Sequence, residues 1–171
     1  SVSPAGYTVT IKGGGDVVQT GVWGATAGGI VLDSAFSGTV TLNRANTFTG
    51  GVAIKKGTVV VGIGNATTVS GALGPSASAA TLGDAAGGSA SLLANQFTVS
   101  NPINLGVDAA GTLTIGNNGG TTAPTFSGPI ALNGDNLTIS RTGTTGAMTV
   151  SGGITGTGNL ILNNAGSTST L

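Results

Sequence analysis

The chain has only five carboxylate side chains, and they are the first candidates for chemistry. They are Asp16, Asp33, Asp84, Asp108 and Asp135, and the sequence contains no Glu. Glycoside hydrolysis generally needs two carboxyl groups held several ångströms apart. Only Asp108 and Asp135 have a spacing that would put them on adjacent turns of a repeat. Both lie in Gly-containing segments, where Asp commonly accepts local backbone hydrogen bonds, so we interpret them as turn residues.

Other catalytic and metal-binding residue types are scarce. The chain has no His and no Cys, which excludes a disulfide, a thiol nucleophile, an imidazole base and the usual zinc sites. The run Gly13-Gly14-Gly15-Asp16 resembles one copy of a calcium-binding glycine motif, but such sites need tandem copies. Ser and Thr are abundant but have no evident base to activate them. We therefore expect no catalytic, cofactor-binding or metal-binding residues, and we expect that the protein is not an enzyme.

The charge pattern also limits the partners. Five Lys or Arg balance five Asp, and the only adjacent basic pair is Lys55-Lys56, which we interpret as a solvated turn. Lys12, Arg44 and Arg141 are isolated in the sequence. Binding to nucleic acid needs clustered positive charge, so we expect no nucleic-acid partner. No apolar run approaches the ~20 residues of a membrane-spanning helix, so we expect no membrane insertion of this segment.

The elements that would position any site follow from an internal repeat. A turn of small polar residues or glycine leads into an apolar-x-apolar triplet five times, in Ser37–Leu42, Thr49–Ile54, Ser100–Leu105, Ser127–Leu132 and Ser151–Gly156. A period of about 24 residues made only of short strands and turns is typical of a solenoid. The chain therefore predicts an all-β, single-stranded parallel β-helix of about six or seven coils with three strands each.

The spacing of the repeat also predicts which side chains stack. Ile103, Ile130 and Ile154 follow one another at nearly constant intervals of one repeat, and we expect them to form one aliphatic column inside the rod. The second triplets of the same coils contain Leu113, Leu137 and Leu160, which recur in step with the first set. We expect these leucines to form a second column.

We expect a single β-helix domain over residues 1–171. Residues 1–35 are the least regular and predict an irregular first coil or a cap, because terminal repeats are commonly atypical. Residues 64–95 are rich in Ala, Ser and Gly, and we expect them to form a loop that protrudes from the solenoid. Phe97 then restarts the regular pattern.

One segment resembles a known family. The run Leu42-Asn43-Arg44-Ala45-Asn46-Thr47-Phe48-Thr49-Gly50-Gly51-Val52-Ala53-Ile54-Lys55-Lys56-Gly57-Thr58-Val59-Val60-Val61-Gly62, followed by Gly71-Ala72-Leu73-Gly74, is similar to the passenger-associated transport repeat, also called the autotransporter-associated β-strand repeat. The resemblance implies a right-handed parallel β-helix in the passenger of a bacterial type V secretion protein. It also implies an extracellular or outer-membrane surface location and a role in folding during export. The family repeat has no catalytic residues to transfer.

Three classes of function follow. The leading hypothesis is a structural stalk that presents adhesive regions, with neighbouring repeats as its contacts; a variant of it is end-to-end self-assembly of copies into a filament or surface layer. The second class is an adhesin module that binds a glycan or a host surface through the 64–95 loop or an exposed strand face. The third, a polysaccharide lyase or hydrolase, ranks last because it rests only on the fold that such enzymes share.

Overall fold

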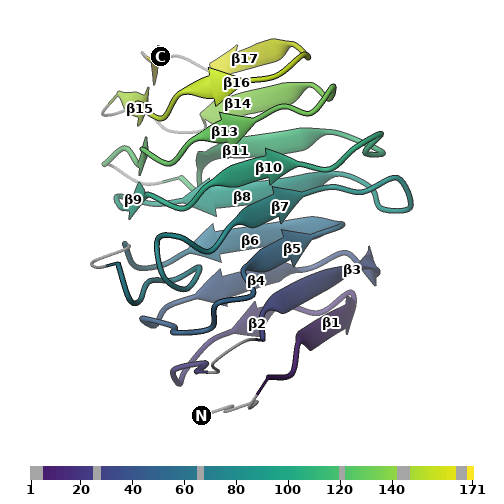
Figure 1. Cartoon of the computed structure of the whole chain (residues 1–171), viewed down its shortest axis with the longest axis vertical. Helices are drawn as coiled ribbons and strands as arrows, with labels where there is room; N and C mark the ends of the chain where they lie inside the picture. Colours follow the sequence, from purple (N-terminus) through teal and green to yellow (C-terminus); the bar gives the residue numbers. More distant parts are fainter. Residues whose placement is uncertain (1–5, 25–27, 65–67, 120–121, 142–146, 165–168) are drawn as a thin grey trace.

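The computed structural model describes residues 6–24, 28–64, 68–119, 122–141, 147–164 and 169–171 of the 171-residue chain. These residues form strands, turns and bends without any helix, so the described part offers none that could cross a membrane. The strands stack on one another along the long axis of the molecule, from β1 near the N-terminus to β17 near the C-terminus (Figure 1).

The described residues form three parallel sheets, which are the walls of the rod. The first has seven strands: β1 (Val9–Gly13), β3 (Ile30–Phe36), β5 (Val52–Ile54), β7 (Ala80–Leu82), β10 (Ile103–Leu105), β13 (Ile130–Ala131) and β16 (Ile154–Thr155). The second also has seven: β2 (Val17–Val18), β4 (Thr39–Leu42), β6 (Gly57–Val61), β8 (Ala90–Ala94), β11 (Leu113–Asn117), β14 (Leu137–Arg141) and β17 (Leu160–Asn164). The third has four: β9 (Thr98–Val99), β12 (Thr125–Phe126), β15 (Met148–Val150) and β18 (Ser169–Thr170).

The predicted parallel β-helix is confirmed. Strands that are consecutive in a sheet come from successive coils, so each strand lies over its counterpart one coil earlier. The seven strands of each long sheet agree with the predicted number of coils. From β7 onward, each coil has three strands. In the earlier coils, the described residues on the third side of the rod form no sheet strand.

Both predicted aliphatic columns are confirmed. Ile130 pairs with Ile103 on one side and with Ile154 on the other. Leu137 likewise pairs with Leu113 and Leu160. Alternation along a strand sends every second side chain inward, so these columns form the core. Leu137 is fully buried, whereas Leu160 is 38% exposed because no further coil of the described chain lies on β17.

The first column extends through the whole first sheet. Val9 pairs with Ile30, Ile30 with Val52, Val52 with Ala80 and Ala80 with Ile103. The same inward position is thus apolar in every coil, and the core is one continuous aliphatic stack.

The prediction that residues 64–95 form a protruding loop is wrong. This segment contains β7 and β8, which pair with β5 and β6 below and with β10 and β11 above. Ala80, Leu82, Ala90, Leu92 and Ala94 are buried in the core. Alanine has a weak strand propensity, and its small side chain hides the alternating pattern, which explains why the sequence favours a loop here.

Of the two alternatives predicted for residues 1–35, an irregular first coil or a cap, the described residues form coils. β1 and β2 form a first coil. β3 already belongs to the second coil and pairs with β5 of the next coil. Ile11 and Val17 of the first coil are only partly buried because they pack against the core from one side.

The segment that resembles the transport repeat has two parts, residues 42–62 and residues 71–74. These parts contact each other on the third side of the early coils. Asn46 and Gly71 exchange backbone hydrogen bonds of 2.8 and 3.2 Å, and they form an isolated antiparallel bridge. Phe48, Ala72 and Leu73 are buried beside this bridge and fill the core where the described residues form no third-sheet strand.

Candidate functional site

Asp108 and Asp135 lie on neighbouring turns, as their spacing predicts. Asp135 Oδ2 accepts a hydrogen bond of 3.2 Å from the backbone N–H of Ala109, so the carboxylate joins one turn to the turn of the preceding coil. Asp108 is exposed and has a positive φ of 52°. Both residues are turn residues, and the hydrogen bond of Asp135 gives its carboxylate a structural role.

The other three carboxylates also have local partners. Asp16 Oδ1 accepts from Thr39 N at 2.7 Å, which ties the Gly13–Asp16 turn to the next coil. Asp33 lies 3.9 Å from the Lys12 ammonium, and Asp84 lies 3.0 Å from the Lys55 ammonium. Within the described residues, no group of three or more carboxylates comes together to hold a metal ion.

Arg141, which is isolated from other basic residues in the sequence, is buried in the structure. It is 2% exposed and is one of the largest fully buried side chains. It lies two positions after Ile139 and four after Leu137, so the strand alternation of β14 turns it inward. Continuing that alternation to the end of the strand would have found this from the sequence.

Several asparagines connect successive coils through their amides. Asn46 is fully buried: its Oδ1 accepts from Gln19 Nε2 and Trp23 N, and its Nδ2 donates to Ala72 O. Asn101 Nδ2 donates to two carbonyls, and Asn133 Nδ2 donates to Leu105 O at 2.7 Å. These side chains form most of their hydrogen bonds with backbone groups of another coil. They do not form a continuous ladder in which one side-chain amide bonds to the next.

The candidate binding site is an open groove of about 400 Å³ on one corner of the rod. It is lined by residues that follow the second-sheet strands of three successive coils: Gly62, Asn95, Gln96, Phe97, Asn118, Gly119 and Thr122. We call it the amide groove. None of these lining residues is charged.

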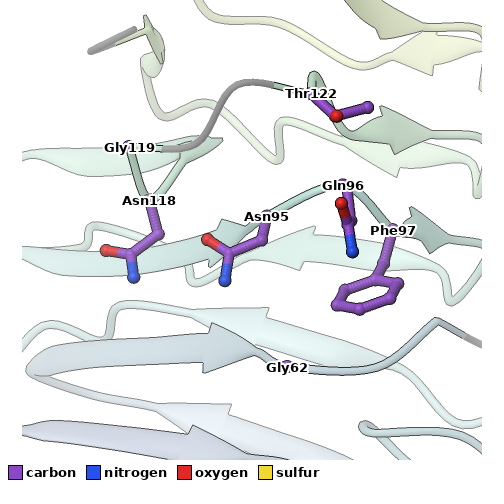
Figure 2. Close-up of a pocket in the computed structure, with 7 residues that line it drawn as sticks. All are labelled: Gly62, Asn95, Gln96, Phe97, Asn118, Gly119 and Thr122. Carbon is purple, nitrogen blue, oxygen red and sulfur yellow. The ribbon is translucent and has the colours of Figure 1, made fainter.

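The parallel register explains how the amide groove forms. Val61 pairs with Ala94, and Ala94 pairs with Asn117, so the next residues Gly62, Asn95 and Asn118 follow one another along the rod. Gly62 has no side chain, and the Asn43 side chain of the preceding coil lies against it, since a Cβ at Gly62 would run into Asn43 Oδ1. Figure 2 shows Asn118, Asn95, Gln96 and Phe97 all pointing toward the coil that carries Gly62.

The amides of the groove are available to a ligand. Asn95, Gln96 and Asn118 make no side-chain hydrogen bond or ion pair within the part of the chain that the structure describes. Gln96 and Asn118 are exposed, and Asn95 and Phe97 are half-buried. Phe97 thus differs from Phe36, Phe48 and Phe126, which are buried in the core.

Sequence reasoning missed this groove. Its signal was present, because Asn95 and Asn118 each follow an alternating strand and are separated by one coil. The predicted loop over residues 64–95 concealed the register that aligns them.

Comparison with known proteins finds no matching family model, no matching curated protein and no matching solved structure. The likeness of residues 42–74 to the transport repeat therefore stays a prediction.

Proposed function

We propose that this chain is a structural β-helical stalk segment of a large secreted or surface-displayed bacterial protein, where it assists export and presents adhesive regions. The observation that carries the proposal is the continuous column of paired positions that runs through the first sheet from Val9 to Ile154. A solenoid in which every coil contacts only its neighbours folds progressively and forms an elongated support.

The outer surface supports the same role. The outward positions of the third sheet align Thr98, Thr125 and Thr149 on successive coils. In the second sheet, Thr39, Thr58, Ser91 and Thr114 align in the same way. Neutral hydroxyl side chains give a hydrated exterior with little electrostatic attraction for nucleic acid or anionic membranes.

Rigidity of the rod is the first test. Thr10 and Thr155 occupy the same outward column on the first and last strands of the first sheet, and both are exposed. The chain lacks Cys, so Thr10→Cys with Thr155→Cys allows clean double spin labelling. Six coil steps of ~4.8 Å predict a backbone separation of about 29 Å. A narrow distance distribution supports a stalk, and a broad one spanning tens of ångströms argues against it.

Export is the second test. The chain is fused between an N-terminal epitope and a bacterial translocator domain, and surface exposure of the epitope is measured by antibody labelling of intact cells. We expect efficient display of the parent and reduced display of Ile130→Asp, whose coil cannot stack. Equal display of both would show that folding of the β-helix does not contribute to export.

End-to-end self-assembly is a second candidate. Leu160 and Leu162 of β17 are 38% and 53% exposed, and Ile11 and Val17 at the other end are only partly buried. These side chains occupy inward positions of the terminal coils. The first coil of a second copy could therefore stack on β17 in the same register as a further coil of the chain. Light scattering over a concentration series should then reveal filaments that Leu162→Lys abolishes. A monodisperse monomer at high concentration would contradict assembly.

A further inference from the structure

We propose that the amide groove binds one or two sugar units of a neutral glycan. This goes beyond the stalk role, which needs no ligand. The proposal rests on the juxtaposition of three amides and one phenyl ring on a corner of the rod.

The polar groups of the groove match hydroxyl groups. Each of Asn95, Gln96 and Asn118 offers two N–H donors and one carbonyl acceptor, whereas a sugar hydroxyl both donates and accepts. Asn95 and Asn118 lie on adjacent coils, about 4.8 Å apart along the rod, and can reach different hydroxyls of one ring. None of the three amides is already engaged by another side chain of the described residues.

The aromatic residue supplies the apolar surface that a sugar ring needs. Phe97 follows Gln96 directly, and its ring lines the groove beyond the amides (Figure 2). Gly64 lies beside it, since a Cβ at Gly64 would be 3.7 Å from the ring atom Cδ1. An aromatic face beside polar groups suits a ligand that presents C–H bonds on one side and hydroxyls at its edge.

The lack of charge in the lining selects against ionic ligands. An anionic sugar or a nucleic acid would lose hydration in this groove without gaining a cationic partner. Strand addition by a peptide is also disfavoured, because backbone groups at the groove are already paired. Gly62 N donates to Leu42 O, and Asn118 N donates to Ala94 O.

The volume agrees with a small ligand. About 400 Å³ lies in the range of sites that hold small molecules, and the groove is open, so a longer glycan could extend beyond it. Binding of one or two units through a few neutral hydrogen bonds would be weak for one chain. Copies displayed together on a surface would bind more tightly through multivalency.

The test uses the full chain, labelled with ¹⁵N, and a defined panel of probes. The neutral probes are cellotriose, maltotriose, mannotriose and chitotriose, and the anionic probe is trigalacturonic acid. Nuclear magnetic resonance follows the side-chain NH₂ signals of Asn95, Gln96 and Asn118, and calorimetry measures the affinity. We expect these signals to shift saturably with at least one neutral trisaccharide.

Variants assign the binding to the groove. Asn118→Ala and Asn95→Ala should each weaken binding by about three- to tenfold, and the double variant should remove measurable binding. Phe97→Leu keeps an apolar side chain but removes the ring, and it should also weaken binding. The matched control is Asn159→Ala with Asn163→Ala, because both asparagines are exposed and lie away from the groove on the last coil. All variants are checked for an unchanged thermal melt.

Three results would overturn the proposal. One is the absence of saturable binding to every neutral probe. Another is a double variant, folded as the parent, that keeps the parent affinity. The third is a preference for trigalacturonic acid over the neutral trisaccharides. None of these results bears on the rigidity of the rod, so the stalk proposal is tested separately.

Discussion

The side-chain amides of Gln19 and Asn46 donate hydrogen bonds to each other across adjacent coils. Gln19 Nε2 lies 2.6 Å from Asn46 Oδ1, and Asn46 Nδ2 lies 3.3 Å from Gln19 Oε1. The same Asn46 amide also accepts a hydrogen bond from Trp23 N and donates one to Ala72 O. One buried side chain thus joins three segments at a position where the rod has no third-sheet strand among its described residues.

Replacing this amide should destabilise the N-terminal half of the rod. Asn46→Leu keeps the branching of the side chain but leaves Trp23 N and Ala72 O without their partner, and each unsatisfied group costs roughly 1–3 kcal/mol. We expect a loss of about 2–4 kcal/mol in urea unfolding followed by the fluorescence of Trp23, the only tryptophan. Asn159→Leu, at an exposed position, is the control. Equal stability of the two variants would contradict the role of Asn46.

The aliphatic column gives a second prediction. Ile130 is fully buried between Ile103 and Ile154, so Ile130→Asp places an unpaired charge in the core. We expect a loss of roughly 3–5 kcal/mol in the free energy of unfolding. The neighbouring Ala131→Asp points outward and should cost less than about 1 kcal/mol. A thermal melt of Ile130→Asp within a degree or two of the parent would show that the assigned register is wrong.

Close approach of successive coils gives a third prediction. A Cβ at Gly152 would run into the carbonyl oxygen of Gly128, whereas a Cβ at Gly153 would meet no atom within 4 Å. Gly152→Ala should therefore destabilise the protein by about 1–3 kcal/mol through overpacking. Gly153→Ala should leave stability unchanged or raise it by up to about 1 kcal/mol, because it restricts the unfolded chain. Differential scanning calorimetry compares the pair, and the reverse order would refute the packing argument.

A fourth prediction concerns metal ions. The carboxylates of Asp16 and Asp135 accept backbone hydrogen bonds, and those of Asp33 and Asp84 form ion pairs, so each has a local partner other than a metal. We expect folding to require no metal. Thermal melts with and without excess chelator should superimpose. A large downward shift of the melting temperature with chelator would show a metal site that these contacts do not explain.

A fifth prediction concerns catalysis. Acid and base catalysis needs converging groups with suitable pKa values, and Asp135 is instead engaged by Ala109 N while Asp108 occupies an exposed turn. We expect no product release from acidic or neutral polysaccharides. Chromatography of a glycan panel incubated with the protein is the measurement. Turnover that Asp135→Asn abolishes would replace the structural proposal with an enzymatic one.

The amino-acid sequence alone determined the class of fold and the core of the C-terminal half. Ile103, Ile130 and Ile154 recur one coil apart, and branched aliphatic residues that alternate with Thr and Asn read directly as strands with one buried face. Parallel stacking then follows because a repeat must cover its neighbour. The same logic failed at Ala80 and Ala90, where a small side chain occupies the inward position and gives almost no hydrophobic signal.

Only the tertiary structure determined which side chains meet at the corners of the rod. The positions of Gly62, Asn95 and Asn118 along one edge depend on a register that passes through β6, β8 and β11, and the spacing of Asn95 and Asn118 becomes informative only once β8 is recognised as a strand. The bridging role of Asn46 depends likewise on which neighbouring coil covers it. Local periodicity specifies the strands, whereas contacts between coils are set only when the strands stack, and the candidate site is made of those contacts.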